Sequence, residues 1–246
     1  MGYWELADNY IRGLNDTRIR GIVTEKELKI LHSDRAKRIH FIIKKFLNKK
    51  NPKVLDVGCG LGEIDIGLSR FGYKITAFDS DRGAIKIAKI GNKESGTDVN
   101  FYVDDDIKLK KRFDLVIMNH SIEHLADAEK ILKKVFKVLN SSGVLFLTTA
   151  NRLYFIDPHT GALFSPWFDK KLFTWNGLKG LLEDAGFTVH NLTPYVLQNI
   201  ERIYSSSEHH SPLKFKLMKV ASKLLRSERL INIVAESFFI VATVSK

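Results

Sequence analysis

The sequence predicts an α/β fold: a doubly wound, mostly parallel seven-stranded sheet with N-terminal helices and a helical cap before the last strand. Two observations lead to this prediction. Short apolar runs alternate along the chain with stretches that carry apolar residues at helical spacing. The connections between these elements are short and punctuated by turn residues. This alternation is typical of parallel sheets covered by helices, and such sheets bind ligands beyond the carboxyl ends of their strands.

Seven apolar runs are the predicted strands. Continuous apolar runs of this length, bounded by turn residues, are typical of strands buried on both faces. The fourth run is strongly apolar and follows polar loop residues, and the seventh is apolar throughout and closes the sheet. The predicted strands are 54–57, 74–78, 100–103, 113–118, 144–149, 187–192 and 237–244.

Helices are predicted between these strands. Apolar residues follow helical spacing from Ser33 onward until Asn51 and Pro52 end the pattern. Glycine after the last periodic residue is a common helix stop, and it ends three of the predicted helices. The stops are Gly72, Gly91 and Gly186, and a further helix ends near Gly143. These four helices are predicted at 61–71, 81–90, 126–139 and 176–185.

The length of 246 residues fits one domain with an ample core. We predict N-terminal helices over 1–53, a ligand-binding core over 54–150 and a distinct segment over 151–246, with a cap insertion at about 195–235. The net charge is +11, and its excess lies in the flanks. Residues 54–210 carry 19 Lys and Arg against 20 acids. Basic flanks can attract an anionic partner or can simply be solvated surface.

The composition predicts a cytoplasmic protein. No run approaches the roughly 18 uninterrupted apolar residues of a spanning helix. The N-terminus lacks a secretory signal. One cysteine, Cys59, excludes an internal disulfide and fits a reducing compartment.

The main chemical signal lies at residues 54–63, where an apolar run meets three glycines at alternate positions. A dinucleotide fingerprint, G-x-G-x-x-G, would place its third glycine at 63, where this chain has Glu63. The chain instead reads G-x-G-x-G, with Asp56 two residues ahead. A strand that turns sharply into a helix needs glycine where φ is positive and where a ligand approaches the backbone. Asp79 follows the second strand, where an acid can accept both hydroxyls of a ribose.

Four motifs in order resemble those of class I S-adenosylmethionine (SAM) dependent methyltransferases, which share a Rossmann-like sheet. They are the glycine loop, the acid after the second strand, F-D-L-V-I-M-N-H-S-I-E-H at 113–124, and G-V-L-F at 143–146. Within that family, S-I-E-H-L and T-A-N-R resemble the branch containing ubiquinone-pathway O-methyltransferases and small-RNA 2′-O-methyltransferases. The resemblance implies a SAM-dependent methyltransferase. Its implied cofactor-binding residues are Asp56, Gly58, Cys59, Gly60, Gly62, Asp79, Ser80, Asp105, Asp106, Asn119 and His120.

Methyl transfer to a hydroxyl requires alignment of the acceptor and removal of its proton, and histidine suits the second task at neutral pH. The candidate bases are His120, His124 and His159, and we favour His159 because it lies in an aromatic segment that should form the acceptor wall. Some members of the branch bind a divalent metal through Glu-x-x-Glu-His plus a later histidine. This chain has His120 in place of the first Glu, and His159 lies in a later loop, so a metal here would be a softer ion than Mg²⁺. We interpret Glu123 and His124 instead as structural residues that anchor the loop after the fourth strand, and we predict no metal.

We predict O-methylation of a small-molecule or lipid-linked acceptor such as a phenol, sugar or carboxyl group. Residues 213–226 combine an apolar helix face with a cationic stripe, which fits peripheral contact with a membrane. Those residues equally fit a cap helix packed on the sheet with solvated lysines. One alternative function is an RNA or tRNA methyltransferase, suggested by the basic flanks. Another is a nucleotide-dependent oxidoreductase, which Glu63 disfavours.

Overall fold

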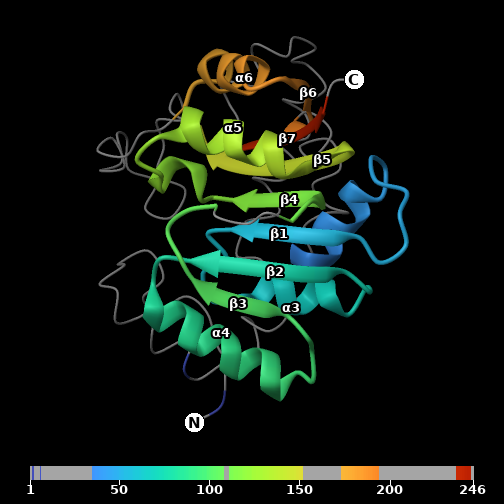
Figure 1. The fold of residues 1–246 in the computed structure, drawn as a ribbon, viewed down its shortest axis with the longest axis vertical. Helices are drawn as coiled ribbons and strands as arrows, with labels where there is room; N and C mark the ends of the chain where they lie inside the picture. The colour runs from blue at the N-terminus through green and yellow to red at the C-terminus, as the bar shows by residue number, and fades with distance from the viewer. Residues whose placement is uncertain are drawn as a thin grey trace, which may run out of the picture. The chain divides into compact units, whose positions relative to one another are not determined.

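The computed structural model describes residues 2, 6, 35–107, 111–151, 173–193 and 237–244. All seven predicted strands are present, and they form one sheet with the order β3-β2-β1-β4-β5-β7-β6 (Figure 1). The predicted α/β fold is therefore confirmed. The chain divides into two compact units, residues 1–117 and 118–246. Each is described by itself, and the predicted arrangement of 1–246 as one domain stays a prediction.

The first unit is built on parallel strands. β1 (Lys53–Val57) pairs with β2 (Lys74–Asp79), and β2 pairs with β3 (Asn100–Val103). β4 (Phe113–Asn119) pairs with the other side of β1 through residues 115–117. Figure 1 shows these four strands side by side. Because they are parallel, their carboxyl ends meet at one edge of the sheet.

Helices of the first unit pack on this sheet. α3 (Glu63–Ser69) and α4 (Arg82–Glu94) contact each other and β2. The helix over residues 35–43 packs against α3, because a Cβ added at Gly67 would lie 2.4 Å from the Cβ of Ala36. A buried carboxylate, Asp114, accepts hydrogen bonds from Lys49 Nζ at 2.8 Å and from the N–H of Lys53 at 2.9 Å. It thereby fixes the start of β1.

The predicted stop of α4 at Gly91 is wrong. Gly91 is buried inside the helix, which continues to Glu94. The turn occurs at Gly96, whose φ of +62° is a left-handed conformation that glycine adopts without strain. The Asn92 side chain closes this turn, donating to the carbonyl of Val99 at 3.0 Å and accepting from its N–H at 3.1 Å. A polar side chain, rather than the first glycine, therefore sets the helix end.

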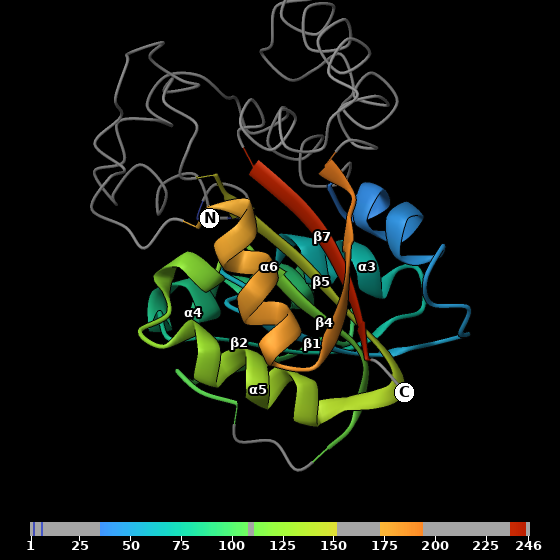
Figure 2. The same ribbon diagram turned by 90° about the horizontal axis from the view of Figure 1, so that it is seen from above.

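The second unit contains η1 (Ile122–His124), α5 (Ala128–Val138), β5 (Leu139–Ala150), α6 (Trp175–Asp184), β6 (Phe187–Asn191) and β7 (Ser237–Val244). β7 runs antiparallel to both β5 and β6, so the sheet is mixed. α5 and α6 lie beside each other (Figure 2). The rings of Phe136 and Phe187 meet edge to face at 5.2 Å. The helix stop predicted near Gly143 is wrong, because α5 ends at Val138 and Gly143 lies within β5.

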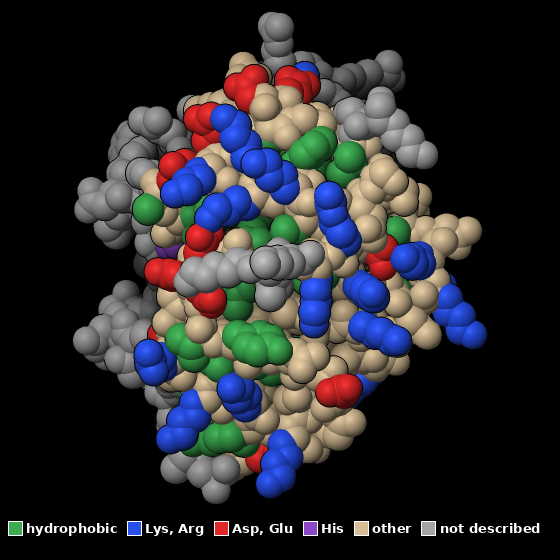
Figure 3. Space-filling view, in the orientation of Figure 1, with side chains coloured by type: hydrophobic (Ala, Val, Ile, Leu, Met, Phe, Trp, Pro, Cys, Tyr) green, Lys and Arg blue, Asp and Glu red, His purple; other side chains and the backbone are tan. Residues whose placement is uncertain are grey.

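Several predictions fall on residues outside the described ones. These are the N-terminal helices before residue 35, the aromatic segment at 152–172 and the cap at 195–235, including 213–226. Within the described ranges, no helix is long and apolar enough to cross a bilayer. Lys and Arg side chains are spread over the face shown in Figure 3, with carboxylates among them.

Candidate functional site

The glycine loop follows β1 in a chain of left-handed turns. Gly58, Gly60 and Gly62 have φ values of +79°, +55° and +73°. A Cβ at Gly62 would lie 2.5 Å from the ring of Phe101, so this position is closed by packing as well as by backbone conformation. A Cβ at Gly60 would meet nothing within 4 Å. Gly60 therefore borders open space in which a ligand can approach the backbone.

The loop is fixed to the carboxyl end of β2. The N–H groups of Gly58 and Cys59 donate to the carbonyl oxygen of Phe78 at 2.9 and 3.1 Å. The carboxylate of Asp79 continues this attachment: Oδ2 accepts from the N–H of Gly60 and Oδ1 from the N–H of Asp81, each at 2.9 Å. A carboxylate has about four acceptor positions, so Asp79 keeps capacity for hydroxyl donors. The predicted ribose acceptor therefore lies directly beside the loop.

The three acids after β3, residues 104–106, make different contacts. Asp104 Oδ1 accepts from the N–H groups of Asp105 and Asp106 at 2.9 and 3.3 Å, which makes Asp104 the residue that forms the turn. The N–H of Asp104 donates to the carbonyl of Asp79 at 3.0 Å, so this turn adjoins the end of β2. Asp106 Oδ1 accepts from the N–H of Ile107, whereas Asp105 is exposed. Ser80, also predicted to contact the cofactor, is exposed beside Asp79.

Two carboxyl groups lie buried under the loop, and the sequence analysis identified only one of them. Asp56 on β1 is 2% exposed and Asp65 on α3 is 0% exposed. Burial raises the pKa of Asp56 to about 7. Burial and the neighbouring Asp56 raise the pKa of Asp65 well above its usual range. The available signal was helical spacing, because Asp65 stands three residues before the buried Leu68 on an otherwise apolar helix face.

Cys59 lies in the same acidic surroundings. Burial raises the pKa of its thiol, and the neighbouring acidic groups raise it further. A thiol with a raised pKa stays protonated and is a poor nucleophile. We therefore interpret Cys59 as a small residue that fills the loop rather than as a nucleophile.

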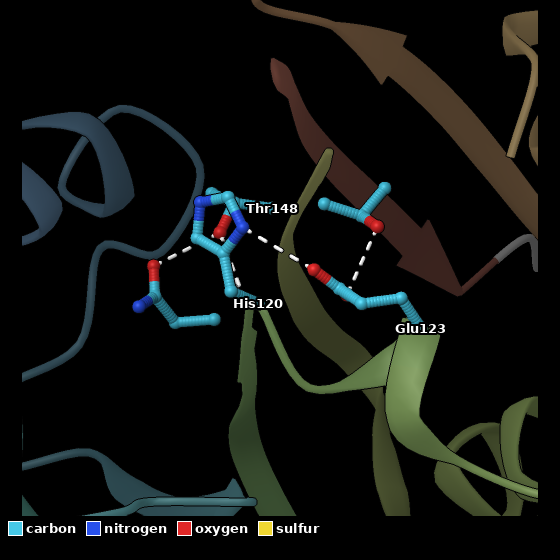
Figure 4. Close-up of polar contacts among 5 residues, drawn as sticks. His120, Glu123 and Thr148 are labelled. Atoms are coloured by element: carbon cyan, nitrogen blue, oxygen red, sulfur yellow. Dashed lines mark hydrogen bonds and ion pairs between the residues drawn. The ribbon is translucent and has the colours of Figure 1, made fainter. Parts of the chain in front are cut away.

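The second unit holds a polar cluster at the ends of β4 and β5 (Figure 4). Thr148 Oγ1 donates to Asn119 Oδ1 at 2.9 Å, and the N–H of His120 donates to the carbonyl of Thr148 at 3.0 Å. His120 Nδ1 lies 3.3 Å from Glu123 Oε1, and Thr149 Oγ1 donates to Glu123 Oε2 at 2.9 Å. The φ of His120 is +52°, which is uncommon for a residue with a side chain and often marks functional positions.

Glu123 is the ionised group of this cluster. Burial acts to raise its pKa, but the hydrogen bond and charge of His120 outweigh burial, with help from Thr149, and hold the pKa of Glu123 below its usual range. The ionised carboxylate is 7% exposed, while the His120 side chain is 46% exposed. Glu123 therefore anchors Nδ1 of the imidazole and leaves the other ring nitrogen for solvent or a ligand.

The remaining candidates are placed as follows. His124 is exposed on η1, and its N–H donates to the carbonyl of Ser121 at 3.0 Å. His159 lies outside the described residues. Among the residues that the structure describes, no three His, Cys, Asp or Glu side chains are grouped to hold a metal ion. The predicted absence of a metal stays a prediction, because His159 was part of the element considered.

Comparison with known proteins identifies the family. The model of a methyltransferase domain matches residues 30–192. The ubiquinone biosynthesis O-methyltransferase of Pelagibacter ubique is 29% identical over 146 residues, which cover 58% of this chain and 56% of that protein. The ubiquinone biosynthesis O-methyltransferase of Xanthomonas axonopodis pv. citri is 32% identical over 128 residues, which cover 50% of this chain and 53% of that protein. The chain thus spans about half the length of the curated relatives it matches.

Solved structures share the fold. Magnesium protoporphyrin IX methyltransferase from Synechocystis PCC 6803, crystallised with SAM, has a TM-score of 0.59 at 14% identity, with 100% of this chain and 98% of that chain covered. A TehB-like SAM-dependent methyltransferase from Corynebacterium glutamicum has a TM-score of 0.57 at 16% identity, with 97% of each chain covered. The resemblance predicted from four motifs is confirmed. This chain belongs to the methyltransferase-domain family.

Proposed function

We propose that this protein transfers the methyl group of SAM to an oxygen atom of a small-molecule or lipid-linked acceptor. Family membership and the sheet topology support methyl transfer. The observation that carries the proposal is the bond between Asp79 and the glycine loop. It holds an acid that suits a ribose beside a backbone that a ligand can approach.

The residues of the first unit fit SAM. Gly60 offers open space beside its backbone, and Asp79 retains acceptor capacity for two hydroxyls. Asp56 Oδ1 is buried without a hydrogen-bond partner among the described residues, which suits a cationic group. The exposed Asp105 would accept from the adenine amino group, with Asp106 next to it. When bound, SAM supplies a methyl carbon that its sulfonium already activates toward nucleophiles.

The second unit supplies a candidate general base. His120 is half exposed, and Glu123 anchors its Nδ1, so the other ring nitrogen is free to take the proton of a hydroxyl. Because Glu123 is ionised and buried, it also stabilises the imidazolium that proton transfer produces. His159 stays the alternative base favoured by the sequence. The roles of Asn119 and His120 beside the cofactor remain proposals.

A lipid-linked acceptor is suggested by the relatives. Their printed names assign them to ubiquinone biosynthesis as O-methyltransferases, and a lipid-linked phenol is compatible with O-methylation. The predicted interfacial helix at 213–226 would suit such an acceptor, although it lies outside the described residues.

Ligand-induced thermal shifts test the cofactor first. SAM and S-adenosylhomocysteine should raise the melting temperature and NADH should not, since a ligand that binds only the folded state stabilises it. Labelled SAM is then offered with pools of lipids, phenols, sugars and RNA. Transfer to prenylated phenols supports the proposal. Transfer only to nitrogen acceptors, or a shift with NADH alone, contradicts it.

RNA methylation is a second candidate, because the flanks are basic: residues 1–53 carry 13 Lys and Arg against 6 acids. Binding of RNA through these flanks would weaken steeply with salt. Filter binding of a tRNA pool at about 50 and 200 mM salt, together with the RNA arm of the labelling experiment, decides between the two. Salt-sensitive binding with methyl incorporation into RNA would favour this candidate.

A further inference from the structure

Asp56 and Asp65 form a buried carboxyl pair, of which the proposed function uses only Asp56. Asp56 lies on β1 just before the glycine loop, and Asp65 lies within the first turn of α3. Their exposed fractions are 2% and 0%. The two side chains interact with each other. A pair this deeply buried must satisfy its hydrogen bonds internally.

Ionising both carboxyl groups would cost free energy, because too few hydrogen-bond donors surround them. An ionised carboxylate only accepts hydrogen bonds. Asp56 Oδ1 and both side-chain oxygens of Asp65 then have no donor among the described residues. A buried acceptor without a donor costs about 1–3 kcal/mol, and more when charged. One proton on Asp65 turns that group into a donor and satisfies an oxygen of each residue.

The surrounding charges decide which carboxyl keeps the proton. Burial and the charges of Asp56 and Glu63 raise the pKa of Asp65. Burial and the charges of Glu63 and Asp79 also raise the pKa of Asp56, but hydrogen bonds from Asp65 and from the N–H of Val57 lower it. The hydrogen bonds point the same way: among the described residues only Oδ1 of Asp56 lacks a donor, whereas both side-chain oxygens of Asp65 lack one, so the ionised form is better supported at Asp56. Asp65 is therefore the proton holder, and Asp56 is the first of the two to ionise.

The neighbouring elements complete the electrostatic setting. The loop contributes the protonated thiol of Cys59, and the end of β2 contributes Asp79. The first turn of α3 contributes Glu63, whose charge raises the pKa of both carboxyls. The cations on the helix over residues 35–43, which packs against α3, are Arg35, Lys37 and Arg38.

We propose that Asp65 is held as a neutral carboxylic acid and keeps its proton while donating a hydrogen bond to Asp56, so that Asp56 presents a fixed carboxylate to the α-ammonium group of the cofactor. Asp65 is thus a positioning residue that acts through Asp56. This inference rests on the proposed function, because it takes SAM as the ligand of the loop.

The pair makes cofactor affinity depend on pH. Below about pH 7, Asp56 also takes a proton and can no longer balance a cation, so binding must expel that proton to solvent. The dissociation constant then rises by up to about tenfold for each unit by which the pH falls. Asparagine at position 65 keeps a hydrogen-bond donor of the same shape, whereas leucine removes the donor.

Calorimetric titration of the full chain with S-adenosylhomocysteine, from pH 6 to pH 8.5, tests the proposal. Asp65→Asn should keep the wild-type dissociation constant within about threefold and keep the midpoint of its pH profile. Asp65→Leu should weaken binding about tenfold at pH 7 and move that midpoint upward, because Asp56 loses the donor that favours its ionised form. The exposed Asp98→Asn is the matched control and should change neither quantity.

A measurement on the wild type alone provides the second test. Binding enthalpies at pH 6 in phosphate and in imidazole buffers, which differ in ionisation enthalpy, should reveal release of nearly one proton per ligand bound. Binding without proton release overturns the inference and leaves the proposed function intact, as does an unchanged pH profile in folded Asp65→Leu. Equal losses in Asp65→Asn and Asp65→Leu overturn the donor role. No heat with either SAM or S-adenosylhomocysteine overturns the proposed function together with this inference.

Discussion

Replacing Asp56 with asparagine should stabilise the folded protein at pH 7 and change its stability little at pH 4. In the folded protein, burial raises the pKa of this carboxyl from 3.8 to about 7. The unfolded chain ionises near the ordinary value. Between these two pH values the folded state therefore binds more protons than the unfolded state, and wild-type stability falls as the pH rises.

The magnitude follows from the size of the shift. About three pKa units at 1.36 kcal/mol each give about 4 kcal/mol between pH 4 and pH 7. This is an upper limit, because Asp56 and Asp65 titrate together and Asp65 can relax when its partner changes. Asparagine does not titrate, so the stability of the variant does not fall with pH through this position. For a chain of this size each kcal/mol corresponds to about 2–4 °C in melting temperature.

Melting temperatures and urea midpoints of wild type, Asp56→Asn and the exposed Asp98→Asn are measured from pH 4 to pH 8. The difference between Asp56→Asn and wild type should grow from pH 4 to about pH 7 and level off above it, while the Asp98→Asn difference stays flat. A constant difference for Asp56→Asn across this range would falsify the assignment of a raised pKa to Asp56. The same variant should bind SAM poorly, so stability and function oppose each other at this position.

Five further substitutions address the remaining parts of the site. Asp79→Ala should weaken SAM binding about tenfold or more in a calorimetric titration, because it removes a charged acceptor of two hydroxyls; an unchanged affinity would show that the ribose binds elsewhere. His120→Ala should lower kcat about a hundredfold with SAM affinity intact, and Glu123→Gln should lower kcat less; full turnover in both, with loss in the His159 variant, would move the base to His159. Gly62→Ala should cost about 2–5 kcal/mol in a urea unfolding curve, because it adds a clash to a strained φ. Gly60→Ala should cost only about 1–2 kcal/mol, and similar losses for both glycines would contradict the packing argument.

The central strands were predictable because they are apolar runs that are almost entirely buried, as in β4. The run at 237–244, for example, matches β7 residue for residue. Helix ends were less predictable, since they depend on side chains that the local pattern does not rank. Glycine is a residue type that often ends helices, but Gly91 is buried within α4. Asn92 and Gly96 form the turn that follows the helix.

In the candidate site too, some residues were predictable from the local sequence and others were not. Asp79 was predictable because its place at a strand end determines its neighbours. Asp65 was missed, because its environment depends on which face of α3 meets β1. His120 was predicted, but its anchoring was not. Its partner Thr148 lies 28 residues away in sequence, and only strand pairing brings the two together.

The attachment of Gly60 and Asp81 to one carboxylate has a thermodynamic consequence for ligand uptake. Both N–H groups are already engaged by Asp79, so the glycine loop proposed to bind the nucleoside needs no ordering when a ligand arrives. Rigid receptors lose little configurational freedom on association, and more of the contact enthalpy is then retained as affinity. Temperature-dependent calorimetry should accordingly give a heat-capacity change that reflects ligand desolvation alone, without the larger negative value that accompanies coupled folding.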